Sequence, residues 1–169
     1  MDLGTFIDFD GRPAVRFTRV YEHPVERLWQ ALTEPGELAH WFPSPEVRME
    51  PRVGGKIEFS GDPNIEEDVS VGTVLVHEPP HRLAFTWGGD ELHFTLRAAG
   101  EGGCELTLVD VLERRDAAAR NAAGWDVCLG ALGARIAGTE ARAAPDWGPR
   151  YEAYIAEGLP SGAPVPGTE

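Results

Sequence analysis

The sequence is poor in cysteine and has no cluster of metal-binding side chains. Its two cysteines, Cys104 and Cys128, form neither a CxxC pair nor a His-Cys group. The five histidines are scattered, without the HxH or HExxH spacing that brings two imidazoles to one metal ion. We therefore expect two buried thiols in a reducing compartment, no metal site and no cofactor.

Positive charge and long apolar runs are also scarce. The formal net charge is -13, and Lys and Arg form no cluster that could replace the counterions of a nucleic acid, which excludes that partner. No stretch approaches the ~18 uninterrupted apolar residues of a membrane span, and the first residues do not resemble a signal peptide. These absences predict a cytoplasmic protein without membrane insertion, either a monomer or a weak homodimer. The acidity, including the segment Asp62–Asp68, serves solubility or a basic protein partner.

Sequence motifs of common catalytic sites are missing as well. The chain contains no GxSxG elbow, no P-loop and no GxGxxG fingerprint. Each of these motifs places a nucleophile or a phosphate-binding loop at a defined turn. The sequence therefore lacks support for a serine hydrolase, a nucleotide triphosphatase or a dinucleotide-dependent enzyme.

The residues that are present describe one globular domain. The chain is 42% hydrophobic and 9% aromatic, which suffices for a folded core. Residues 1–157 carry the periodic apolar pattern of a single domain. Residues 158–169 are rich in Gly, Pro and Ser, and we expect them to form a flexible C-terminal tail.

Two periodicities divide this domain into strands and helices. Alternation with a period of two predicts strands over residues 14–21, 47–51, 56–60, 69–78, 82–87, 91–99 and 105–112. Helical spacing predicts helices over residues 24–34, 35–41, 116–139 and 147–155. Short glycine-bearing turns make the later strands an antiparallel meander. Asp116 is positioned either to cap the long helix or to place a charge in its first turn, and Gly138 lies near its end.

The same order of elements occurs in the helix-grip fold of the START and birch-pollen-allergen (SRPBCC) superfamily. Several segments between Ala14 and Ile136 resemble proteins similar to the activator of the heat-shock-protein ATPase. They are Pro24–Thr33, Trp41-Phe42, Gly54-Gly55, Phe59, Gly72, Glu78–Leu83, Phe85–Trp87, Gly124-Trp125 and Leu129. The resemblance implies an α+β fold in which about six to seven strands wrap around the long C-terminal helix, with an apolar cavity between sheet and helix.

The residues predicted to line that cavity are inward-facing residues of the strands and the apolar stripe of the long helix. They are Trp41, Phe59, Phe85, Trp87, Phe94, Leu108, Asp110, Trp125, Leu129 and Leu132. Each is also a candidate for ordinary core, and the large aromatics Trp87, Phe94 and Trp125 are the stronger ligand contacts. Asp110 either points inward as a ligand anchor or acid, or lies at the rim in water.

Three functions are consistent with these residues and with the resemblance. The first is binding of a small hydrophobic or aromatic molecule in the cavity. The second is a cyclase- or hydrolase-type enzyme that uses Asp110 or His77 with a bound water. The third is a chaperone-associated regulatory protein that acts through its surface. Two convergent titratable groups inside the cavity would favour the enzyme.

Overall fold

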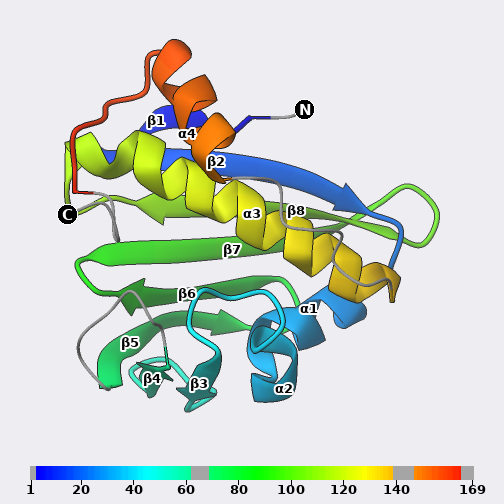
Figure 1. Cartoon of the computed structure of the whole chain (residues 1–169). Helices are drawn as coiled ribbons and strands as arrows, with labels where there is room; N and C mark the ends of the chain where they lie inside the picture. The colour runs from blue at the N-terminus through cyan, green and yellow to red at the C-terminus, as the bar shows by residue number, and fades with distance from the viewer. Residues whose placement is uncertain (1–2, 62–68, 139–146, 165–169) are drawn as a thin grey trace.

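One antiparallel sheet with helices across one face makes up the molecule (Figure 1). The computed structural model describes residues 3–61, 69–138 and 147–164, and within them eight strands pair in the order β1-β2-β8-β7-β6-β5-β4-β3. The strands are β1 (Thr5–Phe9), β2 (Arg12–Tyr21), β3 (Glu46–Met49), β4 (Lys56–Ser60), β5 (Val69–Glu78), β6 (Arg82–Trp87), β7 (Asp90–Ala99) and β8 (Gly103–Val111). The helices are α1 (Val25–Thr33), α2 (Pro35–Leu38), α3 (Ala118–Ala137) and α4 (Trp147–Ala156).

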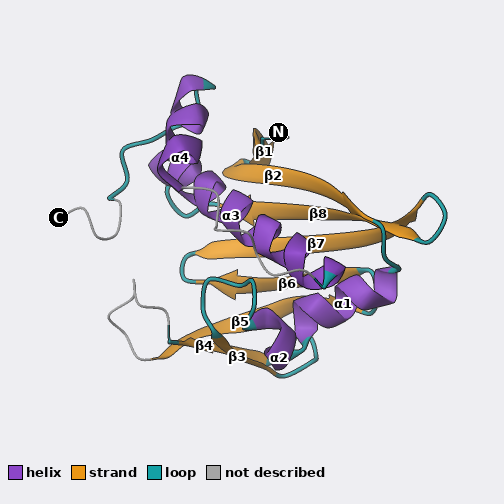
Figure 2. Cartoon of the chain, turned by 45° about the vertical axis from the view of Figure 1, so that its right-hand side comes forward, coloured by secondary structure: helices purple, strands orange, loops and turns teal. Residues whose placement is uncertain are grey.

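This arrangement confirms the predicted helix-grip fold, with α3 lying across the sheet as Figure 2 shows. The sheet has more strands than the expected six to seven, because the sequence prediction missed β1. Asp10 and Gly11 both have positive φ angles, 51° and 84°, and close a two-residue hairpin between β1 and β2. An Asp-Gly pair is a typical signal for such a turn, and it stands in the sequence directly after Phe9.

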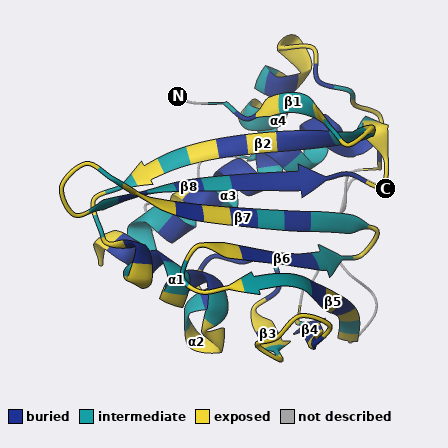
Figure 3. Cartoon of the chain, turned by 180° about the vertical axis from the view of Figure 1, so that it is seen from behind, coloured by how far each residue is buried: buried dark blue, intermediate teal, exposed yellow. Residues whose placement is uncertain are grey.

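The first strand covers part of the sheet face that points away from α3. Ala14, Val109 and Val111 form a small buried cluster there, and Ile7 and Phe9 of β1 pack over it. Figure 3 shows this face, with β8 buried along much of its length. The outer cluster explains why none of the β8 residues is exposed although β8 belongs to an open sheet.

Two short helices, α1 and α2, pack at one end of the sheet, at the lower right in Figure 1. The buried residues of α1 follow helical spacing, and they are Val25, Leu28, Ala31 and Leu32. Trp41, which follows α2, donates a hydrogen bond from Nε1 to the Ala31 carbonyl oxygen at 2.8 Å. This bond joins the segment after α2 to α1 and thereby fixes the position of Trp41.

The long helix begins without the predicted side-chain cap. Asp116 lies in a short 3₁₀ turn and accepts hydrogen bonds from Arg114, so its carboxylate is not bonded to the helix N-terminus. Instead, the Ala119 N–H donates to the carbonyl oxygen of Pro160 at 2.9 Å. At the other end Gly138 adopts the left-handed conformation that commonly ends a helix.

The chain after α4 corrects the expectation of a free tail from residue 158. Leu159 and Ala163 are buried, and the Ala163 N–H donates to the Asp116 carbonyl oxygen at 3.2 Å. Arg120 donates to the Pro164 carbonyl oxygen at 2.8 Å. Residues 159–164 therefore pack on the start of α3, while residues 165–169 of the predicted tail, and the acidic segment Asp62–Asp68, lie outside the described residues.

Candidate functional site

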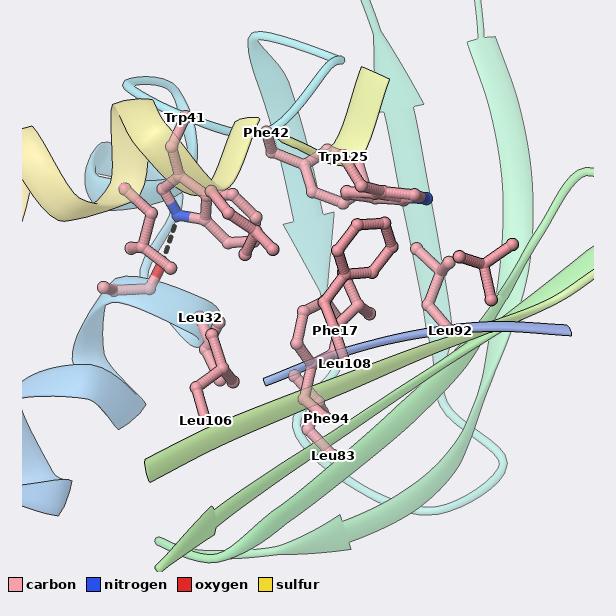
Figure 4. Close-up of a cluster of buried hydrophobic side chains, with 14 of the residues drawn as sticks. Phe17, Leu32, Trp41, Phe42, Leu83, Leu92, Phe94, Leu106, Leu108 and Trp125 are labelled. Carbon is pink, nitrogen blue, oxygen red and sulfur yellow. Dashed lines mark hydrogen bonds between the residues drawn. The ribbon is translucent and has the colours of Figure 1, made fainter. Parts of the chain in front are cut away.

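Seven aromatic side chains meet between the sheet and α3 and form what we call the aromatic cluster. Its members are Trp41, Phe42, Phe59, Phe85, Trp87, Phe94 and Trp125. Phe42 is the central ring, with centroid distances of 5.6 Å to Phe59, 5.7 Å to Trp87 and 6.0 Å to Trp125. Figure 4 shows Phe42 between Trp41 and Trp125, above the strands.

The cluster is assembled from five separate parts of the chain. Phe59 comes from β4, Phe85 and Trp87 from β6, Phe94 from β7 and Trp125 from α3. Trp41 and Phe42 follow α2 in a segment without regular secondary structure. All of these side chains are buried except Trp87, which is only partly buried. Trp87 therefore marks the edge at which the cluster meets solvent.

The residues predicted for the site lie together between the sheet and α3. For the strand residues, this agrees with the face that alternation assigns to them. Leu108, Leu129 and Leu132 belong to the same buried core as the aromatic cluster. Their packing against one another fits both core and ligand contact, so their role in binding stays a prediction. The prediction missed Phe42, the central ring of the cluster. Phe42 stands beside Trp41 in the motif that carries the resemblance, and that pairing was the available signal.

Asp110 is the polar member of this interior. It lies on β8 and pairs with Leu92 of β7 and Val15 of β2, both fully buried. Its carboxyl is 0% exposed, so the alternative position at a solvated rim is wrong. Trp125 donates from Nε1 to Asp110 Oδ2 at 2.9 Å, which joins the carboxyl to the aromatic cluster.

A second carboxylate, Asp90, shares a hydrogen-bond donor with Asp110. Asn121 of α3 donates from Nδ2 to Asp90 Oδ2 at 3.1 Å and to Asp110 Oδ2 at 3.3 Å. The Glu113 N–H donates to Asp90 Oδ1 at 2.9 Å. Asp90 and Asn121 were not predicted, because a hairpin residue and a polar helix residue give no periodic signal of their contact.

These surroundings favour the neutral form of Asp110. Burial raises the pKa of its carboxyl well above the usual range, and the neighbouring Asp90 raises it further, through its charge and through a hydrogen bond between the two side chains. The hydrogen bonds from Trp125 and Asn121 act in the opposite direction and are weaker. The site therefore favours the protonated form of a buried carboxyl group that is bonded to Trp125, an arrangement suited to anchoring a polar atom or to supplying a proton.

His77 lies elsewhere in the molecule. A bulge between Val74 and Val76 shifts the register of β5, so that His77 pairs with Leu83. Its ring packs edge-on against Trp29 of α1, with the centroids 5.6 Å apart. Because of this bulge, simple alternation along β5 does not predict the face on which His77 lies.

The described residues show neither a metal-binding cluster nor a membrane-spanning helix. No group of three or more His, Cys, Asp or Glu side chains in residues 3–61, 69–138 and 147–164 is arranged to hold a metal ion. Among the same residues, no helix has the length and apolar character needed to cross a membrane. The Cys104 thiol is buried and the Cys128 thiol is half-buried, so the expectation of two buried thiols is correct for Cys104 alone.

Comparison with known proteins gives one family and many structures of the same fold. The family described as "Activator of Hsp90 ATPase homolog 1-like protein" matches residues 22–137. A conserved protein of unknown function from Enterococcus faecalis is 18% identical, with a TM-score of 0.75 over 91% of this chain and 89% of that one. CalU16 from Micromonospora echinospora is 24% identical, with a TM-score of 0.69 over 90% and 94%. A Bordetella parapertussis protein is 26% identical, with a TM-score of 0.68 over 95% and 92%. No curated protein matches the chain.

Proposed function

Because the chain belongs to the family of proteins similar to the activator of Hsp90 ATPase homolog 1, we propose that it binds a small apolar or aromatic molecule between the sheet and α3. A fold alone does not select a function, so the proposal rests on the site. The observation that carries it is the aromatic cluster, in which rings from five parts of the chain converge beside one buried carboxyl. Ligand sites are typically built in this way, from apolar walls and few polar groups.

Phe42 is the ring that we expect the ligand to displace. The other members of the cluster, apart from Trp41, are held by strands or by α3, and Trp41 is held by its bond to Ala31. Phe42 lies on the irregular segment between α2 and β3 and has no such restraint on its ring. Since it contacts five other rings, its displacement would leave a space lined by aromatic side chains.

The proposal is tested with an apolar fluorescent probe and two variants of opposite effect. Leu129→Trp adds bulk to the face of α3 that packs in the core, and we expect it to reduce probe binding. Phe42→Leu removes a ring from the cluster, and we expect it to increase probe binding. Val111→Ala is the control, because it truncates a buried side chain on the opposite face of the sheet.

Unfolding midpoints of the same proteins show whether a change in probe binding comes from the site itself or from a loss of stability. Opposite shifts for Leu129→Trp and Phe42→Leu, with Val111→Ala unchanged in probe affinity, support a site at the aromatic cluster. Equal probe signals from all four proteins would place any binding elsewhere and refute the proposal. Native mass spectrometry of the purified protein provides a second test, since a ligand that remains bound through purification adds a defined mass.

One observation favours a second candidate function, acid catalysis on the bound molecule. Asp110 and Asp90 are two convergent carboxyl groups, and the pKa of Asp110 is raised by burial and by Asp90. In a cyclase- or hydrolase-type reaction Asp110 would supply the proton. Recovery of the bound molecule unchanged after incubation with the protein argues for binding alone, and a product lost in Asp110→Asn argues for the enzyme.

A further inference from the structure

The side chains of Asp90 and Asp110 are hydrogen-bonded to each other. An ionised carboxylate has no donor, so this bond requires one of the two groups to hold a proton. Asp110 is 0% exposed and pairs with the buried residues Val15 and Leu92 on either side, so its place within the sheet is fixed. The two carboxyl groups therefore share one proton at the end of the sheet where α3 begins (Figure 1).

Asp90 is the partner that is able to move. It is the first residue of β7, is only partly buried, and follows the two-residue turn Gly88-Gly89. Across this turn it pairs with Trp87, whose ring centroid lies 5.6 Å from that of Trp125. Because Asp110 is fixed, a separation of the two carboxyl groups displaces Asp90 and, with it, Trp87.

The charged groups on the surrounding elements offer this pair no cation. They are Arg12 of β2, Glu91 and His93 of β7, Glu113 after β8, which lies against Gly89, and Arg120 of α3. Arg12 and His93 both bond to Glu91, and Arg120 donates to the Asn121 side chain. Among the described residues, neither carboxyl group of the pair forms an ion pair. A second negative charge at this place would therefore have no partner of opposite sign.

We propose that the shared proton holds the β6–β7 turn against α3, and that its loss to water at rising pH releases the turn and moves Trp87 away from Trp125. Two carboxylates in contact repel each other, and a buried carboxylate also lacks hydration. Asp90 relieves both costs by reaching solvent, which opens the edge of the aromatic cluster. This inference goes beyond the proposed function, and it is tested without a ligand, so either of the two can fail while the other stands.

Hydrogen exchange of single amides tests the release of the turn. The Glu113 N–H reports on it, because it donates to Asp90 Oδ1 at 2.9 Å. The Leu112 N–H is the internal control, since it donates to the Pro13 carbonyl oxygen at 2.8 Å. We expect the protection of the Glu113 N–H, corrected for the intrinsic effect of pH on exchange, to fall by up to about tenfold per pH unit above the ordinary aspartate pKa of ~3.9.

Urea distinguishes release of the turn from unfolding of the whole protein. Release exposes little surface, so exchange of the Glu113 N–H at low urea concentrations should not depend on urea. Exchange of the Leu112 N–H should accelerate with urea, because this amide exchanges when the sheet unfolds. The same protection and the same urea dependence for both amides would overturn the proposal, since the turn would then open only with the rest of the fold.

Two variants of the pair and one control identify the group that titrates. Asp110→Asn and Asp90→Asn each replace the shared proton by an amide donor, so both should keep the Glu113 N–H protected as the pH rises. Either variant suffices if the other does not fold. Glu91→Gln is the matched control, because Glu91 follows Asp90 directly but bonds to Arg12, and it should retain the pH dependence. Retention of the pH dependence in both variants of the pair, or its loss in the control, would contradict the proposal.

Tryptophan fluorescence provides a second readout, because the released turn carries Trp87. Quenching by acrylamide should increase over the same pH range in the unmodified protein and should not increase in Trp87→Phe. Quenching that stays constant with pH in the unmodified protein would show that Trp87 does not move, and it would overturn the proposal.

Discussion

At the scale of single residues, Asp110 makes stability depend on pH. Because burial and Asp90 raise the pKa of its carboxyl, the folded protein retains a proton that the unfolded chain releases near the ordinary aspartate pKa of ~3.9. This group therefore stabilises the fold at low pH. Its contribution declines as the pH rises from about 4 through the folded-state pKa.

We predict that Asp110→Asn removes this part of the pH dependence. An amide cannot ionise, and its oxygen can still accept from Trp125 and Asn121. The variant should become more stable relative to the unmodified protein as the pH rises, by up to about 1.4 kcal/mol per pH unit within the window. Urea unfolding at a series of pH values measures this difference. Glu101→Gln, in the exposed β7–β8 turn, is the control, and parallel pH curves for Asp110→Asn and the unmodified protein would contradict the prediction.

Gly72 is a second residue whose environment predicts the effect of a substitution, because β6 leaves no space for a Cβ there. A Cβ at this position of β5 would overlap the carbonyl oxygen of Thr86 and lie 2.9 Å from its Oγ1, which already accepts from the Thr73 N–H. We predict that Gly72→Ala destabilises the protein by about 1–3 kcal/mol, the usual cost of overpacking. The backbone of β6 has no room to retreat, because it pairs with β7 on its other side.

Gly130→Ala is the matched control for this substitution. Gly130 lies inside α3, and a Cβ there would meet nothing within 4 Å. Alanine favours helix more than glycine, so this variant should be more stable by up to about 1 kcal/mol. Denaturant midpoints for the two variants should therefore move in opposite directions. A shift of the same sign in both would show that backbone freedom, and not the contact with Thr86, governs position 72.

At the scale of elements, α3 depends on parts of the chain that are distant in sequence. Asp126 accepts hydrogen bonds from Arg19 of β2 and from Tyr154 of α4. The same Tyr154 hydroxyl accepts from the Gly4 N–H at 2.7 Å. Burial raises the pKa of Asp126, while the bond from Tyr154 and the charges of Arg19 and Arg150 oppose this rise. The long helix is thereby joined to the N-terminal segment, to the sheet and to α4.

The start of α3 depends on the residues that follow α4. We predict that truncation after Glu157 destabilises the protein by about 2–4 kcal/mol, because it exposes the site of Leu159 and leaves the Ala119 N–H without its acceptor. Hydrogen exchange in the first turn of α3 should accelerate in the same protein. Truncation after Pro164 is the control, since it retains all the contacts named above. Equal stability of both truncated proteins would mean that residues 159–164 contribute nothing.

At the scale of the whole molecule, the sheet and α3 enclose one continuous hydrophobic core. The core joins buried side chains from both ends of the chain, from Phe17 of β2 to Leu159 after α4. We predict that treatment with a chelator leaves the melting temperature unchanged, because the described residues contain no metal-binding group. Differential scanning calorimetry before and after chelation measures this, and a lower melting temperature after chelation would disprove it.

Apolar periodicity in the sequence identifies the helices and every strand except β1, because the local period of apolar residues depends on backbone geometry alone. It also brought Phe85, Trp87 and Trp125 to one interior, since alternation assigns each side chain a face. Other features of the site and of the fold depend on how distant segments pack in three dimensions. The state of Asp110 depends on Asp90 and Asn121, which approach it from a hairpin and from α3. The place of His77 follows from a bulge, and the docking of Leu159 from the surface of α3. These features arise from contacts between distant segments, which no local period encodes.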